Sequence, residues 1–171
     1  MELKIRNASI YDLEAVTAVE AECFPVAEAA TEKDFAARLA VYPEFFWLLE
    51  GCQEEERKLI GFVNGMVSDQ PNLCDEMYEN ASMHNADGKW QMIFGVNTLP
   101  DYRRRGYAEM ILRRVIEDAK AQGRKGVVLT CKDKLVHYYA KFGFENEGVS
   151  ESVHGNVVWY QMRLKFDESD E

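Results

Sequence analysis

Three consecutive arginines and one glycine stand directly before the longest amphipathic stretch of the chain. They are Arg103, Arg104, Arg105 and Gly106, and the apolar residues that follow predict a helix over residues 106–122. The first amides of a helix lack carbonyl partners and the helix dipole favours negative charge, so this point suits a pyrophosphate. The glycine lets the backbone approach an anion, and the arginines add charge-assisted hydrogen bonds. Taken alone, the same residues are also typical of a solvated loop before a helix.

Charge is divided unevenly along the sequence. Residues 1–88 carry 6 basic and 18 acidic side chains, whereas residues 101–141 carry 11 basic and 5 acidic ones. The net charge of −10 disfavours nucleic acid as a partner. A basic segment within an acidic protein predicts a small anionic ligand, with a cationic second ligand on the acidic side. Solvated helix faces would give the same counts.

Length and composition predict one globular domain outside the membrane. The chain has 171 residues, close to a typical domain of about 150. Hydrophobic residues make up 47% of it, which excludes a disordered chain. No apolar run is long enough to span a bilayer, and the N-terminus lacks the features of a secretory signal, so we expect a cytoplasmic protein without membrane contact.

The cysteines give no indication of a metal site. Cys23, Cys52, Cys74 and Cys131 form no CxxC pair, and no histidine stands at a zinc-ligand spacing from any of them. We therefore expect reduced thiols, no disulfide framework and no bound metal.

Hydrophobic periodicity predicts an α/β chain in the order βααββ, an irregular segment, then βαβαββ. Capping-box spacing at residues 9–12 and 31–34 starts two helices, and two more are expected over 106–122 and 135–142. Strands are expected over 3–6, 45–49, 59–67, 90–98 and 126–131, from 144, and over 158–166. This order predicts a central twisted, mixed, seven-stranded sheet with about four helices on its two faces.

Two segments fall outside that pattern. Residues 69–88 are polar and irregular, and we expect an insertion with one helical turn near Glu76. Residues 167–171 form an acidic tail that we expect to be disordered. The remainder, residues 1–166, is predicted to be a single domain.

Several motifs, taken in order, resemble the GNAT acetyltransferase superfamily. Arg103-Arg104-Arg105-Gly106-Tyr107-Ala108 follows a strand and a Pro-x-Tyr-Arg step and is similar to the family's R/Q-x-x-G-x-G/A element. Residues 127–136 and 139–144 look like its second cofactor segment, and residues 5–12 like its opening. The likeness covers nearly the whole chain. It implies the GNAT fold, acetyl-CoA as donor and a direct attack by an amine in one ternary complex.

Within the superfamily the chain is most similar to the serotonin (arylalkylamine) N-acetyltransferase group. The segment from Cys131 through Asp133 and Tyr139 to Phe144 matches that group almost residue for residue. Cys23-Phe24-Pro25 and His154-Gly155-Asn156 also look similar. The resemblance implies that Tyr139 is the general acid that protonates the leaving thiolate, although its helical spacing with Leu135 and Phe142 is also that of a core residue.

The resemblance implies a set of binding residues as well. Those expected to hold the cofactor are Val96, Asn97, Thr98, Arg103, Arg104, Arg105, Gly106, Tyr107, Ala108 and Asp133. Backbone amides around Phe94 to Val96 are expected to hold the thioester oxygen. Those expected near the acceptor are Phe24, Pro25, Trp90, Met92, Phe94 and His154. For Trp90, packing is the alternative interpretation.

One departure from the group concerns the proton of the amine. The group carries a His-x-His pair on its fourth strand, and the two matching positions here are Met92 and Phe94. An alkylamine has a pKa near about 10, so its deprotonation at pH 7 costs roughly 4 kcal/mol without assistance. We hypothesise a route through water on the acidic side, past a carboxylate.

The sequence therefore predicts transfer of acetyl to a primary amine, most simply a small cationic one, by a monomer or homodimer. A protein or peptide N-acetyltransferase is the nearest enzymatic alternative. A noncatalytic acyl-CoA-binding sensor is the alternative from another class, favoured by the missing histidines and opposed by Tyr139.

Overall fold

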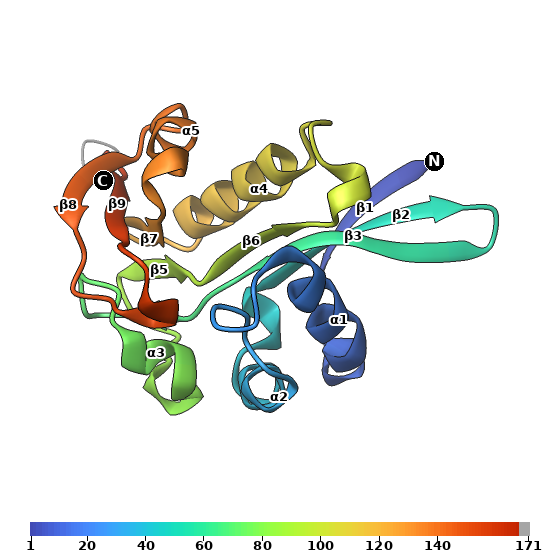
Figure 1. Ribbon diagram of the computed structural model, residues 1–171, viewed down its shortest axis with the longest axis horizontal. Helices are drawn as coiled ribbons and strands as arrows, with labels where there is room; N and C mark the ends of the chain where they lie inside the picture. Colours follow the sequence, from blue (N-terminus) through green and yellow to red (C-terminus); the bar gives the residue numbers. More distant parts are fainter. Residues whose placement is uncertain (168–171) are drawn as a thin grey trace. The chain divides into compact units, whose positions relative to one another are not determined.

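The computed structural model describes residues 1–167 and contains two sheets in two compact units (Figure 1). The first unit comprises residues 1–65 and 95–115, and the second comprises residues 66–94 and the chain from 116 onward. The long helix α4 (Tyr107–Ala121) runs across the boundary between residues 115 and 116. The predicted α/β class is confirmed.

The first unit contains an antiparallel sheet with strand order β1-β2-β3-β6. Its strands are β1 (Glu2–Asn7), β2 (Phe46–Gln53), β3 (Glu56–Asn64) and β6 (Gly95–Thr98). Phe46, Leu48 and Phe62 are fully buried with Phe35 of α2, so aromatic packing fixes this core. Helices α1 (Leu13–Cys23) and α2 (Glu32–Val41) cover one face of this sheet (Figure 1).

Gly61 makes the β3–β6 pairing possible. It stands opposite Thr98 in the register, and a Cβ at Gly61 would lie 2.2 Å from the carbonyl oxygen of Asn97. No side chain fits at that distance, so the two backbones can approach only because residue 61 is glycine. Gly61 is therefore a requirement of the sheet.

Both predicted capping boxes are confirmed. The Ser9 side chain accepts a hydrogen bond at the start of the short helix that leads into α1, and Asp12 Oδ2 accepts one from the Ser9 amide at 2.9 Å. Thr31 and Asp34 make the same reciprocal pair at α2. Each box satisfies amides that the helix geometry leaves without carbonyl partners.

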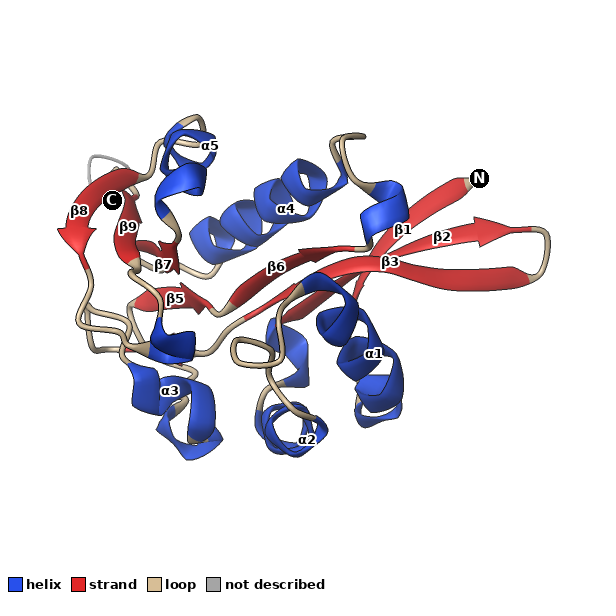
Figure 2. Cartoon of the chain, viewed as in Figure 1, coloured by secondary structure: helices blue, strands red, loops and turns tan. Residues whose placement is uncertain are grey.

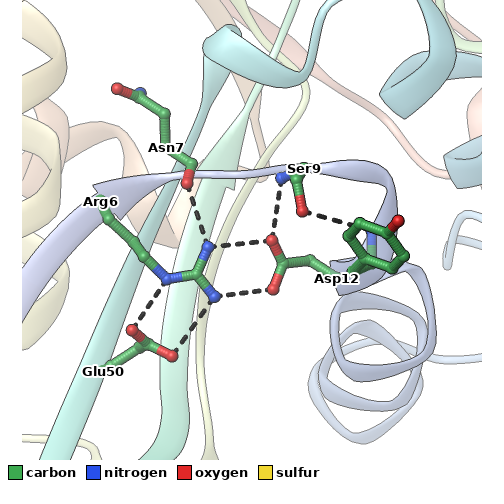
Figure 3. A network of polar contacts seen from close by, with 6 residues as sticks. Arg6, Asn7, Ser9, Asp12 and Glu50 are labelled. Carbon is green, nitrogen blue, oxygen red and sulfur yellow. Dashed lines mark hydrogen bonds and ion pairs between the residues drawn. The ribbon is translucent and has the colours of Figure 1, made fainter.

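Asp12 also belongs to an ion-pair network around Arg6 (Figure 3). The Arg6 guanidinium donates to both Asp12 oxygens at 2.7 and 2.9 Å and, through Nε, to Glu50 Oε1 at 2.8 Å. The third partner is the Asn7 carbonyl, which accepts Arg6 Nη1 at 3.1 Å. Glu50 is buried on β2 beside a β-bulge, so the network ties β1, β2 and the entry to α1 together.

The second unit contains a mixed sheet with strand order β4-β5-β7-β9-β8. Its strands are β4 (Val67–Ser68), β5 (Trp90–Ile93), β7 (Gly126–Cys131), β8 (Glu145–Val149) and β9 (Tyr160–Lys165). β5 and β7 are parallel and the other pairs are antiparallel. Two short helices, α3 (Asp75–Glu79) and α5 (Val136–Ala140), belong to this unit (Figure 2). α3 is the helical turn expected near Glu76.

The prediction of one seven-stranded sheet was wrong, because the described residues form nine strands in two sheets. The run 90–98 breaks at Phe94 into β5, which pairs with β4 and β7, and β6, which pairs with β3. The run 59–67 breaks at residues 65–66 into β3 and β4, and the Gly65 amide donates to the Phe45 carbonyl at 3.3 Å. Alternation of apolar residues predicts strand conformation but carries no information about which neighbour accepts the hydrogen bonds.

Three further expectations concern the acidic tail, the domain boundary and membrane-spanning helices. Residues 168–171 of the predicted disordered tail lie outside the described residues. The single-domain boundary of residues 1–166 stays a prediction. Within residues 1–167, no helix is both long and apolar enough to cross a bilayer.

The Arg6 network predicts a specific loss of stability at low pH. The Arg6 hydrogen bonds hold the pKa of Asp12 below its ordinary value, so Asp12 stabilises the fold above the unfolded-state pKa. That contribution disappears as the pH falls through the lower, folded-state pKa. Asp12→Asn should cost about 1–2 kcal/mol near pH 7 and flatten the acid limb of stability, measured by urea unfolding from pH 7 to 3. Glu14→Gln, an exposed change two residues later, is the control and should leave that limb unchanged.

Candidate functional site

In the first unit, the segment between β6 and α4 forms a turn with two left-handed residues. A short 3-10 turn, Pro100–Tyr102, follows β6, and Arg104 and Gly106 then have φ of +65° and +80°. The first hydrogen bond of α4 runs from the Met110 amide to the Gly106 carbonyl at 3.1 Å. The preceding amides of the turn and helix start are the donors that a helix cannot satisfy internally, so the segment has the backbone geometry of an anion site.

The side chains of this segment add positive charge around the turn. Arg103, Arg104 and Arg105 are all exposed. Arg103 Nε donates to the Thr98 carbonyl at 3.1 Å, and the Arg105 guanidinium lies 5.4 Å from the centre of the Tyr102 ring. Lys58 Nζ lies 5.7 Å from the same ring, so four cationic groups gather at this end of β6. A Cβ on Gly106 would meet no atom within 4 Å, which leaves the backbone open to an approaching group.

The end of α1 meets the same strand. Cys23 Sγ donates to the Thr98 carbonyl at 3.3 Å, and burial raises the pKa of the Cys23 thiol. Phe24 follows Cys23, and its ring edge would lie 3.9 Å from a Cβ placed on Gly95. Pro25 is exposed, and its carbonyl accepts the amides of Glu28 and Ala29 at 2.9 Å. The structure thus brings the predicted acceptor residue Phe24 to β6.

The side chains of β6 differ in their exposure. Val96 and Thr98 are half-buried, whereas Asn97 is fully buried with its Nδ2 3.4 Å from the Phe62 carbonyl. Among residues 1–167, Asn97 Oδ1 and Thr98 Oγ1 have no hydrogen-bond partner. β6 is the last strand of its sheet, so alternate backbone groups point away from β3.

Sequence reasoning missed Glu20, a buried carboxylate of the first unit. Glu20 is 6% exposed and lies on α1 among apolar residues. Its Oε2 accepts the Ala30 amide at 2.8 Å, and its Oε1 would lie 3.7 Å from a Cβ on Gly95. Glu20 is one of four acidic residues between positions 14 and 28. Nothing in the sequence distinguishes it from Glu14, Glu22 and Glu28 except its spacing with Val16 and Val19 on the buried face.

In the second unit, Tyr139 is a buried residue of α5. It is 6% exposed, and its ring packs edge-on against Tyr138 and Phe144 with centroids 5.1 and 6.0 Å apart. Burial raises the pKa of Tyr139 well above that of an ordinary tyrosine, and burial raises the pKa of Cys131 to about 11. Tyr139 is thus a phenol that stays protonated at neutral pH. Asp133, at the start of the turn before α5, is exposed.

Phe94 and His154, both predicted to lie near the acceptor, contact the same residue, Tyr78, which the sequence analysis did not single out. Tyr78 of α3 lies 4.6 Å from the Phe94 ring and stacks on His154 at 5.1 Å with 7° between the planes. Trp159 Nε1 donates to the His154 carbonyl at 2.7 Å, and the Tyr78 hydroxyl lies 3.4 Å from Thr130 Oγ1. Tyr78, Phe94, His154 and Trp159 form an aromatic cluster. Tyr78 was overlooked because residues 69–88 show no periodicity.

Trp90 and Met92 have packing contacts instead. Met92 is fully buried, and the Arg163 guanidinium lies 4.6 Å from the centre of the Trp90 ring. Arg163 is itself buried and bonds Glu147 and Asn72 at 2.9 and 2.8 Å. Neither the Met92 nor the Phe94 side chain can take up a proton, so these two residues do not replace the missing histidine pair.

Comparison with known proteins places this geometry in a family. The model of the acetyltransferase (GNAT) family matches residues 9–144. The chain is 26% identical over 110 residues to serotonin N-acetyltransferase of Mesocricetus auratus, across 64% of this chain and 52% of that protein. It is 40% identical over 52 residues to a probable glucosamine 6-phosphate N-acetyltransferase 2 of Oryza sativa subsp. japonica, across 30% of this chain and 31% of that protein.

A solved structure gives the same fold over nearly the full length. The loading GNATL domain of CurA from Lyngbya majuscula superposes with a TM-score of 0.80 at 16% identity, covering 96% of this chain and 98% of that one. The chain spans about half the length of the serotonin N-acetyltransferase that it matches. Because the family model covers most of the sequence, including the arginine-glycine turn, the chain belongs to the acetyltransferase (GNAT) family.

Proposed function

We propose that the protein is an N-acetyltransferase that transfers the acetyl group of acetyl-CoA to a primary amine. The observation that carries this proposal is the turn before α4, with two left-handed residues, helix-start amides and three exposed arginines. Membership of the acetyltransferase family supports it.

The donor set of the turn fits the diphosphate of coenzyme A. Backbone amides from Arg104 to Ala108 supply several N–H donors at the positive end of a helix of 15 residues. The open space at Gly106 admits a phosphate close to the main chain, and the arginines neutralise its charge. Bound acetyl-CoA would supply the thioester.

β6 supports the expected contact with the thioester. As the outermost strand of its sheet, β6 has alternate N–H and C=O groups directed away from β3. Fixed backbone amides near Val96 would stabilise the negative charge that develops on the carbonyl oxygen. The resemblance to the serotonin N-acetyltransferase group assigns protonation of the leaving sulfur to Tyr139, and its raised pKa keeps the proton on the phenol until it is needed.

For the acceptor, the proposal is a small cationic amine. The acidic excess of residues 1–88 favours a cation by long-range attraction. The aromatic cluster around Tyr78 offers stacked rings, which attract ammonium groups and aromatic substituents alike. A peptide N-terminus also presents an amine, so peptides form a separate arm of the first experiment.

The first experiment is a thiol-release assay with acetyl-CoA over phenethylamine, tryptamine, spermidine, ethylamine and short peptides with free N-termini. Transfer to at least one small amine should exceed transfer to every peptide by tenfold or more in kcat/KM. A preference for peptides would replace the small-amine proposal. Absence of thiol release with all acceptors, together with coenzyme binding by calorimetry, would instead favour the noncatalytic sensor.

Gly106→Glu should abolish coenzyme A binding. The side chain fills the open space over the backbone and places a negative charge where the diphosphate would lie. Gly123→Glu is a matched control, since Gly123 has φ +81° and equally open surroundings at the other end of α4. The control has the same left-handed strain, so its affinity by isothermal titration should stay within threefold of wild type. Equal affinity of both variants would show that the turn is not the binding site.

Tyr139→Phe should lower kcat by about tenfold or more while leaving the affinity for coenzyme A within threefold. Tyr138→Phe removes a hydroxyl one residue away and should leave kcat nearly unchanged. Because burial raises the pKa of Tyr139, wild-type activity should persist to higher pH than an ordinary tyrosine acid would allow. Stopped-flow or steady-state thiol release from pH 6 to 10 measures both effects, and unchanged turnover in Tyr139→Phe would remove Tyr139 from the mechanism.

A further inference from the structure

In the second unit, hydrogen bonds tie α3 to the turn between β8 and β9, which comprises residues 150–159. This turn lies beside α3 (Figure 1). Asp75, the first residue of α3, accepts the Val153 amide at 3.0 Å through Oδ2 and the Ser152 hydroxyl through Oδ1. Ser152 Oγ in turn accepts the His154 amide at 3.3 Å. A chain of hydrogen bonds therefore runs from Asp75 to the backbone of His154.

The same two segments also meet through aromatic rings. Tyr78 follows Asp75 by three residues, so both side chains lie on one side of α3. The Tyr78 ring stacks on His154 and also lies 4.6 Å from Phe94. Trp159 holds His154 from within the turn, since its Nε1 donates to the His154 carbonyl at 2.7 Å. The Asp75 hydrogen bonds thus fix the backbone that carries one ring of the stack relative to the helix that carries the other.

Segment 69–88 is held in place on both sides of α3. Before the helix, Asn72 Oδ1 accepts Arg163 Nη2 at 2.8 Å, and Arg163 is itself buried on β9. After the helix, Arg124 Nη1 donates to the Gly88 carbonyl at 2.7 Å. Because both ends are anchored, α3 cannot move away from the β8–β9 turn without breaking several hydrogen bonds.

This closure limits what can lie between α3 and the turn. Phe94 and His154 are both expected near the acceptor, and Tyr78 contacts both of them. A peptide acceptor carries further residues behind its amine and needs an open groove for them. No chain can pass between two segments that are joined by hydrogen bonds and stacked rings, whereas a small amine needs no such passage.

We propose that Asp75 is a positioning residue that keeps Tyr78 and His154 together as a closed wall of the acceptor site, and that this wall selects small amines over peptides. This inference rests on the proposed function and names the residues responsible for its acceptor preference. The wall forms no bond to the reacting atoms. It acts by excluding acceptors that extend beyond a small substituent, and Asp75 acts through Ser152 and Val153.

The test is Asp75→Ala, which removes both acceptor oxygens that hold the turn. It is assayed with the small amine preferred by the wild type and with a short peptide that has a free N-terminus. The ratio of the two kcat/KM values, small amine over peptide, should fall by tenfold or more. kcat for the small amine at saturation should stay within threefold of the wild type. A loss of stability alone would lower both kcat/KM values together and leave their ratio unchanged.

Three further variants separate positioning from removal of charge. Asp75→Asn keeps an oxygen for the Val153 amide and gains an N–H for Ser152 Oγ, so its ratio should stay within threefold of the wild type. Glu76→Ala removes the next, exposed carboxylate of α3 and should leave the ratio unchanged. Tyr78→Ala opens the stack without touching Asp75 and should lower the ratio as Asp75→Ala does.

The stack also has a signature in solution that needs no acceptor. The ring current of Tyr78 shifts the His154 ring protons upfield, and a proton–carbon NMR spectrum records them, with His154→Gln to identify the resonance. Asp75→Ala should move this resonance downfield, whereas Glu76→Ala should leave it in place. An unmoved resonance in Asp75→Ala would show that Asp75 does not position the stack.

The acceptor ratio decides the role of the wall. An unchanged ratio in folded Asp75→Ala and Tyr78→Ala proteins would overturn the proposal while acetyl transfer by the wild type stands. If Asp75→Ala does not fold, Ser152→Ala, which removes one hydrogen bond of the tie, takes its place. A wild type that prefers peptides would also overturn the proposal, and absence of thiol release with every acceptor would refute the proposed function itself.

Discussion

The close approach of β3 and β6 is the constraint on which the candidate site depends. A carbonyl of β6 lies where a side chain of residue 61 would stand, so the pairing exists only with glycine there. Through this pairing β6 becomes the last strand of its sheet, with backbone groups available on one edge. The same strand leads directly into the arginine-glycine turn at one end and begins with Gly95 at the other. One backbone contact therefore positions the β6 edge and the turn that follows it in the first unit.

Buried polar groups in this unit fall into two kinds. Arg6, Asp12 and Glu50 satisfy one another through several short hydrogen bonds, and this network joins two strands to a helix start. Such a closed network stabilises structure and leaves no donor or acceptor for a ligand. On β6, by contrast, the buried side-chain oxygens of Asn97 and Thr98 have no hydrogen-bond partner among residues 1–167. Proteins keep such incompletely satisfied polar groups mainly where function requires them.

In the second unit, burial favours the protonated forms of two side chains. Tyr139 and Cys131 both lie in apolar surroundings, and both have raised pKa values because charge is unfavourable there. A phenol in this environment keeps its proton at neutral pH, which is the state that a general acid needs. In the same unit, Tyr78 contacts Phe94 and His154. One side chain of the polar segment 69–88 therefore packs against two residues that were predicted to lie near the acceptor.

Local patterns in the sequence determined the helix starts, the long helix before Gly123 and the turn at Arg103 to Gly106, because capping, periodicity and glycine conformation depend on neighbours along the chain. The motifs were also sufficient to identify the family. Tertiary structure alone decided that residues 90–98 form two strands in two sheets, since hydrogen-bond partners come from distant segments. It also singled out Glu20 from its acidic neighbours and joined Tyr78 to His154, because burial and contact depend on how elements pack rather than on their order.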